Sequence, residues 1–250
     1  MHHEYSFLFK PVNALLIAIL GEPGEKYLRA MGAQPGEVFW LPDHVIMAML
    51  AVALLAAVLI PLSRRLSVER PSNLQQMVEM IVLGLEDLLE DVIGPGIGKQ
   101  FLPFIAALAL FIFTCNIFGL FFFLQPPTAK TSTTFALSIT AFIFYNVIGI
   151  RKQGFKHYLK HFMGPVPALA WLMFPIEVIS HVARILSLAF RLFGNILGEH
   201  TATGIFMVLV PFVVPWPMMA LGIFGALLQA FIFIMLTMAY LQGAVVAEEH

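Results

Sequence analysis

The sequence has few charged side chains, and this shortage is its first informative feature. Asp, Glu, Lys and Arg together make up 12% of its 250 residues, whereas apolar residues make up 60%. Soluble domains carry about 25% charged and about 45–50% apolar residues. The composition therefore excludes an ordinary soluble domain and indicates a polytopic membrane protein. The net charge of −1 offers no basic surface for nucleic acid, so none is expected as a partner.

Cysteine and catalytic motifs are also scarce. The single cysteine, Cys115, cannot form an intramolecular disulfide, and we expect it to be a small apolar residue in a packed or lipid-facing position. No HExxH metal motif and no phosphate-binding loop occur, so we expect no metal, no cofactor and no direct ATP binding. The apolar run Ala14–Leu20 is too short to predict a cleavable signal peptide. The chain is not expected to be an enzyme by itself.

Three apolar segments have the length of about 20 residues that crossing a ~30 Å hydrocarbon core requires. The predicted upright spans are residues 44–62, 101–124 and 131–150. Arg64 and Arg65 follow the first span, and Arg151 and Lys152 follow the third. Since positive residues stay in the cytoplasm, these ends are predicted to be cytoplasmic and the N-terminal segment 1–41 external.

The remaining segments predict a different geometry. Residues 71–94 alternate acids with leucines at helical spacing, which favours an amphipathic helix on the cytoplasmic surface. Residues 167–210 are apolar over a length of about 66 Å, twice the thickness of the core. Together with residues 218–247 they predict a long, steeply tilted two-helix hairpin. We therefore expect a single all-α membrane domain over residues 1–250, with a cytoplasmic C-terminus.

Polar side chains gather in the apolar stretch Ser180–His200. Ionisable residues are costly inside a membrane and indicate function. Arg191 is the clearest example, because a guanidinium cannot lose its proton to escape burial. At about 100° per residue, one helix face carries Arg191 and six further polar residues. These are Glu177, Ser180, Arg184, Ser187, Asn195 and Glu199. His200 points the opposite way, and Gly194 and Gly198 favour close approach of a neighbouring helix.

Two motifs resemble a known family. Residues Ser187–Asn195 read SLAFRLFGN and Leu228–Phe233 read LQAFIF. With Glu177-x-x-Ser180, they are similar to subunit a of rotary F-type ATP synthases, and the resemblance covers about residues 38–250. It implies a stator, which we expect in a bacterial plasma membrane, with a chloroplast relative as the alternative. The implied partners are the rotating c-ring, the b subunits of the peripheral stalk and membrane lipid.

The resemblance also implies a mechanism. Arg191 would favour the ionised form of a c-ring carboxylate, and two offset half-channels would lead protons to and from it. Glu177, Ser180 and Ser187 would line the cytoplasmic path. Asn195, Glu199, His200 and Gln229 would serve the external path.

The external relay departs from the family pattern. Relatives usually place an acid or histidine nine residues after the arginine and pair it with an ionisable residue on the return helix. Here Glu199 stands at eight and His200 at nine, and the matching return segment Leu221–Phe224 has no ionisable residue. Either residue remains a candidate, and we favour a neutral Glu199 as the cheaper state in low dielectric.

Other interpretations remain open at this point. A secondary transporter could use a midplane arginine to bind an anionic substrate, although the sequence shows no internal repeat. Arg184 could pair with Glu177 or with lipid phosphate. Asn195 and Gln229 could simply join helices by hydrogen bonds.

Overall fold

The computed structural model describes residues 5–33, 38–121, 124–154, 158, 170–209 and 215–245. The regular elements within these ranges are all helical, so the all-α prediction is confirmed. The α-helices are α1 Phe9–Leu20, α2 Glu25–Ala30, α3 Asp43–Arg64, α4 Asn73–Ile93, α5 Leu102–Ile117, α6 Thr131–Gln153, α8 Ala170–Leu209 and α9 Pro215–Val245. The short 3₁₀ turns are η1 Gly98–Phe101, η2 Phe118–Leu120 and η3 Pro127–Ala129.

Among the described residues, 5 helical segments are long and apolar enough to cross a membrane. They contain α3, α5 with its flanking turns, α6, α8 and α9. The polytopic prediction is therefore confirmed. The predicted first residues of the hairpin, 167–169, and the residues 210–214 between its two helices lie outside the described residues. The sequence predicts that the return helix begins at Met218, but α9 begins at Pro215, because proline is tolerated in the first turn of a helix.

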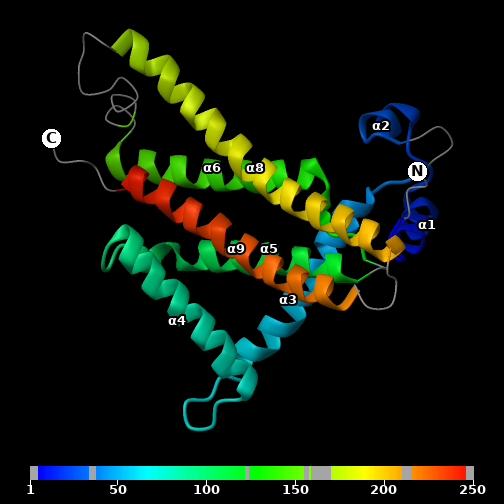
Figure 1. Cartoon of the computed structure of the whole chain (residues 1–250), viewed down its shortest axis with the longest axis horizontal. Coiled ribbons are helices and arrows are strands. Elements are labelled where there is room, and N and C mark those ends of the chain that lie inside the picture. The colour runs from blue at the N-terminus through cyan, green and yellow to red at the C-terminus, as the bar shows by residue number, and fades with distance from the viewer. Residues whose placement is uncertain are drawn as a thin grey trace.

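The helices differ in direction. In Figure 1, α5 and α6 run roughly parallel, whereas α8 and α9 run obliquely across them and converge towards the C-terminal end of α8 and the N-terminal end of α9. α9 packs against both α5 and α6, and α8 packs against α6 and α9. The oblique pair is the tilted hairpin that the length of the apolar segments predicts. The direction of this pair determines which neighbouring helix each polar residue of α8 meets.

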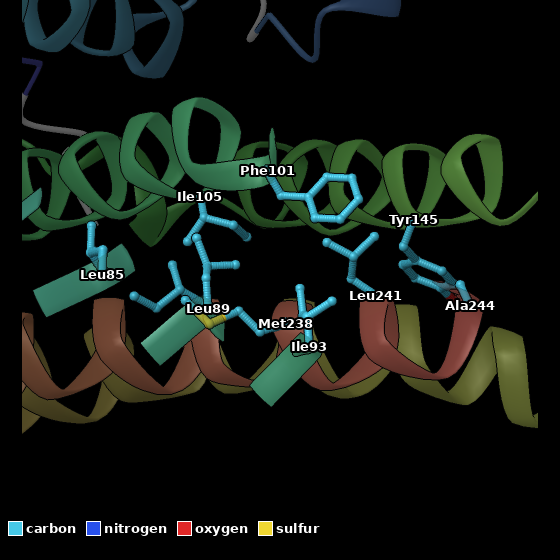
Figure 2. Packing of buried hydrophobic residues seen from close by; sticks show 10 residues of the cluster. Leu85, Leu89, Ile93, Phe101, Ile105, Tyr145, Met238, Leu241 and Ala244 are labelled. Carbon is cyan, nitrogen blue, oxygen red and sulfur yellow. The ribbon is translucent and has the colours of Figure 1, made fainter. Parts of the chain in front are cut away.

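The largest part of the core lies where α4, α5, α6 and α9 meet. Leu89, Ile105, Met238 and Leu241 are buried together there, with Tyr145 at one side (Figure 2). The C-terminal half of α4 thus packs its leucines against α5 and α9. The apolar side of this amphipathic helix therefore faces the protein core. Its acids lie on the other side, where Lys99 Nζ approaches Glu86 Oε1 at 2.5 Å and Glu90 Oε1 at 3.8 Å.

The N-terminal segment is tied to the start of α3 by one buried amide. Asn13 Oδ1 accepts hydrogen bonds from the backbone N–H groups of Trp40 at 2.8 Å and Leu41 at 2.9 Å. Its Nδ2 donates to the carbonyl oxygens of Leu41 at 3.0 Å and Phe9 at 3.1 Å. Asp43 also accepts from the Ser6 backbone N–H at 3.1 Å. These bonds place α1 beside the first span.

Candidate functional site

The packed side of α8 fixes the orientation of its polar residues. Leu188, Ala189, Leu192 and Ile196 are buried at helical spacing. Leu188 and Leu192 pack with side chains of α5, α6 and α9 in one apolar cluster. Because these residues share one side of the helix, residues about half a turn away must face outward.

Arg191 lies on the outward side of α8. Its side chain is exposed, as are those of Ser187 and Asn195, which lie one turn before and after it. Large apolar side chains surround this position, including Phe190, which is 55% exposed. Among the residues that the structure describes, none forms an ion pair or hydrogen bond with the Arg191 guanidinium. The sequence thus predicted the arginine, and the structure shows it unpaired on an apolar surface.

Arg184 behaves differently, although it shares the same helix face. Its Nη2 lies 3.7 Å from Glu177 Oε1, and its guanidinium carbon lies 5.1 Å from the centre of the Tyr240 ring. Of the alternatives left open for Arg184 by the sequence, the ion pair with Glu177 is the one that the structure shows. The same Glu177 Oε1 lies 3.4 Å from Nδ1 of the buried His181. Ser180 is half-buried beside this cluster.

Aromatic residues of neighbouring helices complete this cluster. The Tyr145 ring centre of α6 lies 5.9 Å from that of Tyr240 and 6.3 Å from that of His181. Further towards the same end, Tyr158 donates a hydrogen bond from its hydroxyl to Asn146 Oδ1 at 2.6 Å. Burial raises the pKa of Tyr158 to about 12, so it remains a proton donor at neutral pH. Sequence reasoning assigned no role to Tyr145 and Tyr240, because only packing reveals that they meet α8.

Glu199 turns away from the exposed side and into the helix interface. Its carboxyl group lies against Gly222 and Gly225 of α9 and against Leu120 of η2. α9 therefore packs against the Glu199 side of α8. The His200 side chain lies outside the described part of the structure, so the choice between the two residues stays a prediction.

A cavity of about 360 Å³ reaches Glu199 from the turn at Gln125–Pro126. Its lining includes Leu120 and Gln125 on one side, Thr203 on α8 and Met218 on α9. Among the lining residues that the structure describes, Glu199 is the only acid. The cavity therefore connects the region of the Gln125–Pro126 turn with a single carboxyl group.

Gln229 lies deeper along α9. It is 3% exposed, and its Nε2 atom finds no hydrogen-bond partner among the described residues. Gln229 lies seven positions beyond Gly222, and Leu192 lies seven before Glu199. Since the two helices are antiparallel and Gly222 meets Glu199, Gln229 comes level with Leu192 and hence close to Arg191 along the axis.

Two glycines of α8 do not have the expected packing role within this chain. Side-chain carbons added at Gly194 or Gly198 would meet nothing within 4 Å in the described structure. The glycine that does contact the polar residues is Gly222, which sequence reasoning did not single out. Its only signal was the lack of an ionisable residue in Leu221–Phe224. No group of three or more potential metal-ligating residues gathers within the described ranges.

The fold and the site together define a class: an all-α membrane protein with ionisable residues at membrane depth, suited to moving ions. Comparison with known proteins makes this specific. The chain matches the family described as ATP synthase A chain over residues 45–242. It is 43% identical over 211 residues to ATP synthase subunit a of a Nitratiruptor species, covering 84% of this chain and 92% of that protein.

Two further relatives agree. Identity is 46% over 201 residues with ATP synthase subunit a 1 of Syntrophotalea carbinolica, covering 80% of this chain and 85% of that protein. It is 45% over 174 residues with ATP synthase subunit a of Geobacter sulfurreducens, covering 70% and 75%. The chain belongs to the ATP synthase A chain family. It is a proton-translocating membrane subunit without catalytic activity of its own, and the comparisons give the transporter alternative no support.

Proposed function

We propose that this chain is the stator of the membrane sector and that Arg191 separates two offset proton paths against a ring of c subunits. The exposed, unpaired Arg191 on a membrane-spanning helix carries this proposal. A guanidinium facing lipid is expensive, and charged groups at this depth face protein or water and pair with one another. A partner that covers this face and brings a carboxylate meets that need.

The permanent charge of Arg191 accounts for its role. A carboxyl group of the ring holds its proton while it faces lipid, because desolvation disfavours the charged form. Opposite Arg191 the ionised form is favoured, so the proton leaves only at the stator. The fixed cation also prevents protons from passing directly between the two paths. Lysine cannot replace it fully, because a buried ammonium group can lose its proton.

On the external side, the cavity leads to Glu199. This residue lies eight positions beyond Arg191, or about 12 Å along the helix axis. Both its carboxyl group and the Asn195 amide face Gly225, at 3.7 Å and 4.0 Å from the position of an added Cβ. A proton taken up by Glu199 can therefore pass by way of Asn195 towards the exposed face of α8. Gln229 provides a further polar group close to the level of Arg191, and His200 is the alternative relay.

On the cytoplasmic side, Glu177, Ser180 and Ser187 provide the path. Glu177 lies about 21 Å along the axis from Arg191. Glu177 and Arg184 form a charged pair towards the N-terminal end of α8. Ser187 lies one turn from Arg191 on the exposed side and would extend the path to it. The two paths therefore reach Arg191 from opposite ends of the same helix.

The charge distribution supports the orientation and location. Arg151 and Lys152 lie in the last turn of α6, and Arg64 ends α3, which supports a cytoplasmic location for these ends. The proposed membrane is the bacterial plasma membrane. The N-terminal segment then lies outside and the C-terminus inside. The b subunits of the peripheral stalk and membrane lipid are the further partners that we propose for the remaining apolar surface.

Replacing Arg191 by alanine tests the proposal. We expect the complex to assemble with its ring, because the side chain forms no hydrogen bond or ion pair in the described part of this chain, but ATP synthesis driven by a proton gradient should fall to background. Arg184→Ala is the matched control on the same helix, and it should retain measurable synthesis. Synthesis near the wild-type rate in an assembled Arg191→Ala complex would contradict the proposal.

A further inference from the structure

The glycines in helix contacts of this chain differ in what a side chain would meet. A Cβ added at Gly98 would lie 2.7 Å from the backbone carbonyl oxygen of Leu89. That glycine lets two backbones approach each other. At Gly222 the nearest atoms belong to the side chains of Glu199 and Leu120 instead. The space that a side chain at position 222 would fill is therefore occupied by side-chain atoms of other residues, one of them a carboxylate oxygen.

The geometry at Gly222 is specific. An added Cβ would overlap Glu199 Oε1, far inside the 3.0 Å limit that real Cβ atoms respect, and would lie 3.3 Å from Glu199 Cδ. It would also lie 2.5 Å from Leu120 Cδ2. At Gly225, one turn further along α9, Glu199 Oε2 would be 3.7 Å away, which is an ordinary contact. The carboxyl group thus occupies the place that any other side chain at position 222 would fill.

This position lies between the external cavity and the rest of the proposed path. Glu199 and Leu120 both line the cavity, and Gly222 is buried behind them in α9. A side chain at position 222 would push the carboxyl group out of the interface between α8 and α9. It would also move the group away from the Gly225 region that it shares with the Asn195 amide.

We propose that Gly222 is a positioning residue for proton transfer, whose missing side chain forms the slot that holds the Glu199 carboxyl group between the external cavity and Asn195. The inference rests on the proposed role of Glu199 as the external relay. It also gives a reason why the return helix carries no ionisable residue here: the space is used by the acid of α8.

The alanine variant should affect position more than folding. Both atoms that a new methyl group would displace are at the ends of flexible side chains, so the backbones of α8 and α9 can stay in place. Displacing a reacting group by about 1 Å can lower a rate on the order of 100-fold. We therefore expect Gly222→Ala to assemble but to lose between about 10-fold and about 100-fold in proton transfer.

The experiment measures ATP-driven proton pumping by the intact complex in membrane vesicles, corrected for the amount of assembled complex. Gly222→Ala should show the loss, whereas Gly243→Ala on the same helix, where an added Cβ would meet nothing within 4 Å in the described structure, should pump nearly as the wild type does. Adding Glu199→Asp to Gly222→Ala should restore part of the pumping, since the shorter side chain withdraws the carboxyl group. Adding Leu120→Ala should not restore it.

The controls separate positioning from packing. Restoration by Leu120→Ala but not by Glu199→Asp would assign the loss, or a failure to assemble, to the Leu120 clash and would overturn the inference. Wild-type pumping in Gly222→Ala would overturn it as well. Glu199→Gln is measured in parallel: pumping retained there contradicts the proposed role of Glu199, whereas pumping lost there but normal in Gly222→Ala contradicts only the role of Gly222.

Discussion

The two ends of α8 each carry a glutamate, and their surroundings differ. Glu177 lies within reach of both Arg184 and His181, in a cluster with Tyr145 and Tyr240. At the other end, Glu199 forms no ion pair with any residue that the structure describes and lies against glycines at the inner end of a cavity. An unpaired carboxyl group can bind and release a proton without breaking an ion pair, whereas Glu177 would have to give up Arg184. The comparison therefore supports the proposal that Glu199 relays protons and that Glu177 belongs to a charged cluster at the other end of the path.

The largest effect that this comparison predicts is at Glu199. Glu199→Gln keeps the shape of the side chain but cannot titrate, and we expect passive proton flux through the membrane sector to fall by at least about 100-fold, the lower range for loss of a general acid–base group. His200→Ala should leave most of the flux. Near-normal flux in Glu199→Gln together with lost flux in His200→Ala would transfer the role to the histidine.

A smaller effect is expected at Glu177. Glu177→Gln leaves Arg184 without its ion pair, but water, Ser180 and the nearby tyrosines remain, so the same flux measurement should show a loss of only a few-fold. Combining Glu177→Gln with Arg184→Gln should cost less than the sum of the single effects, because the two residues act as a pair. A loss at Glu177 as large as that at Glu199 would remove the distinction between the two ends.

The smallest effect is expected at Tyr240. Its ring lies under the Arg184 guanidinium, and such a contact contributes about 0.5–2 kcal/mol. Tyr240→Phe keeps the ring and should leave thermal stability nearly unchanged, whereas Tyr240→Leu should lower the unfolding temperature of the purified complex. Equal stability of the two variants would show that the aromatic contact does not hold Arg184 in place.

Sequence periodicity was sufficient to predict helices and to group Arg191 with other polar residues in one stripe. Apolar length identified the five spans and the tilted pair. Periodicity could not show which residues of the polar stripe face outward and which face a neighbouring helix, because that depends on how the helices pack. Arg184 turns inward because Tyr240 offers it a ring, and α9 meets α8 on the Glu199 side.

Other features leave little trace in the sequence. Gly222 matters through the side chain that it lacks, and only the register between α8 and α9 shows which residue fills the space. The Asn13 amide, which ties α1 to the start of α3, is one polar residue in an unremarkable segment. The burial of Leu85 and Leu89 of α4 likewise depends on contacts with distant helices, whereas the burial of Cys115 follows from its apolar surroundings and is confirmed.

The central claim, that two paths reach Arg191 from opposite sides of the membrane, is tested most directly by labelling introduced cysteines. Thr203→Cys lines the external cavity, and Ser180→Cys lies beside Glu177, while the native Cys115 is 0% exposed and should react slowly. A small, water-soluble, membrane-impermeant thiol reagent is applied to the assembled complex in vesicles of either orientation. Position 203 should react only from the external side and position 180 only from the cytoplasmic side. Reaction of both positions from the same side would contradict the account.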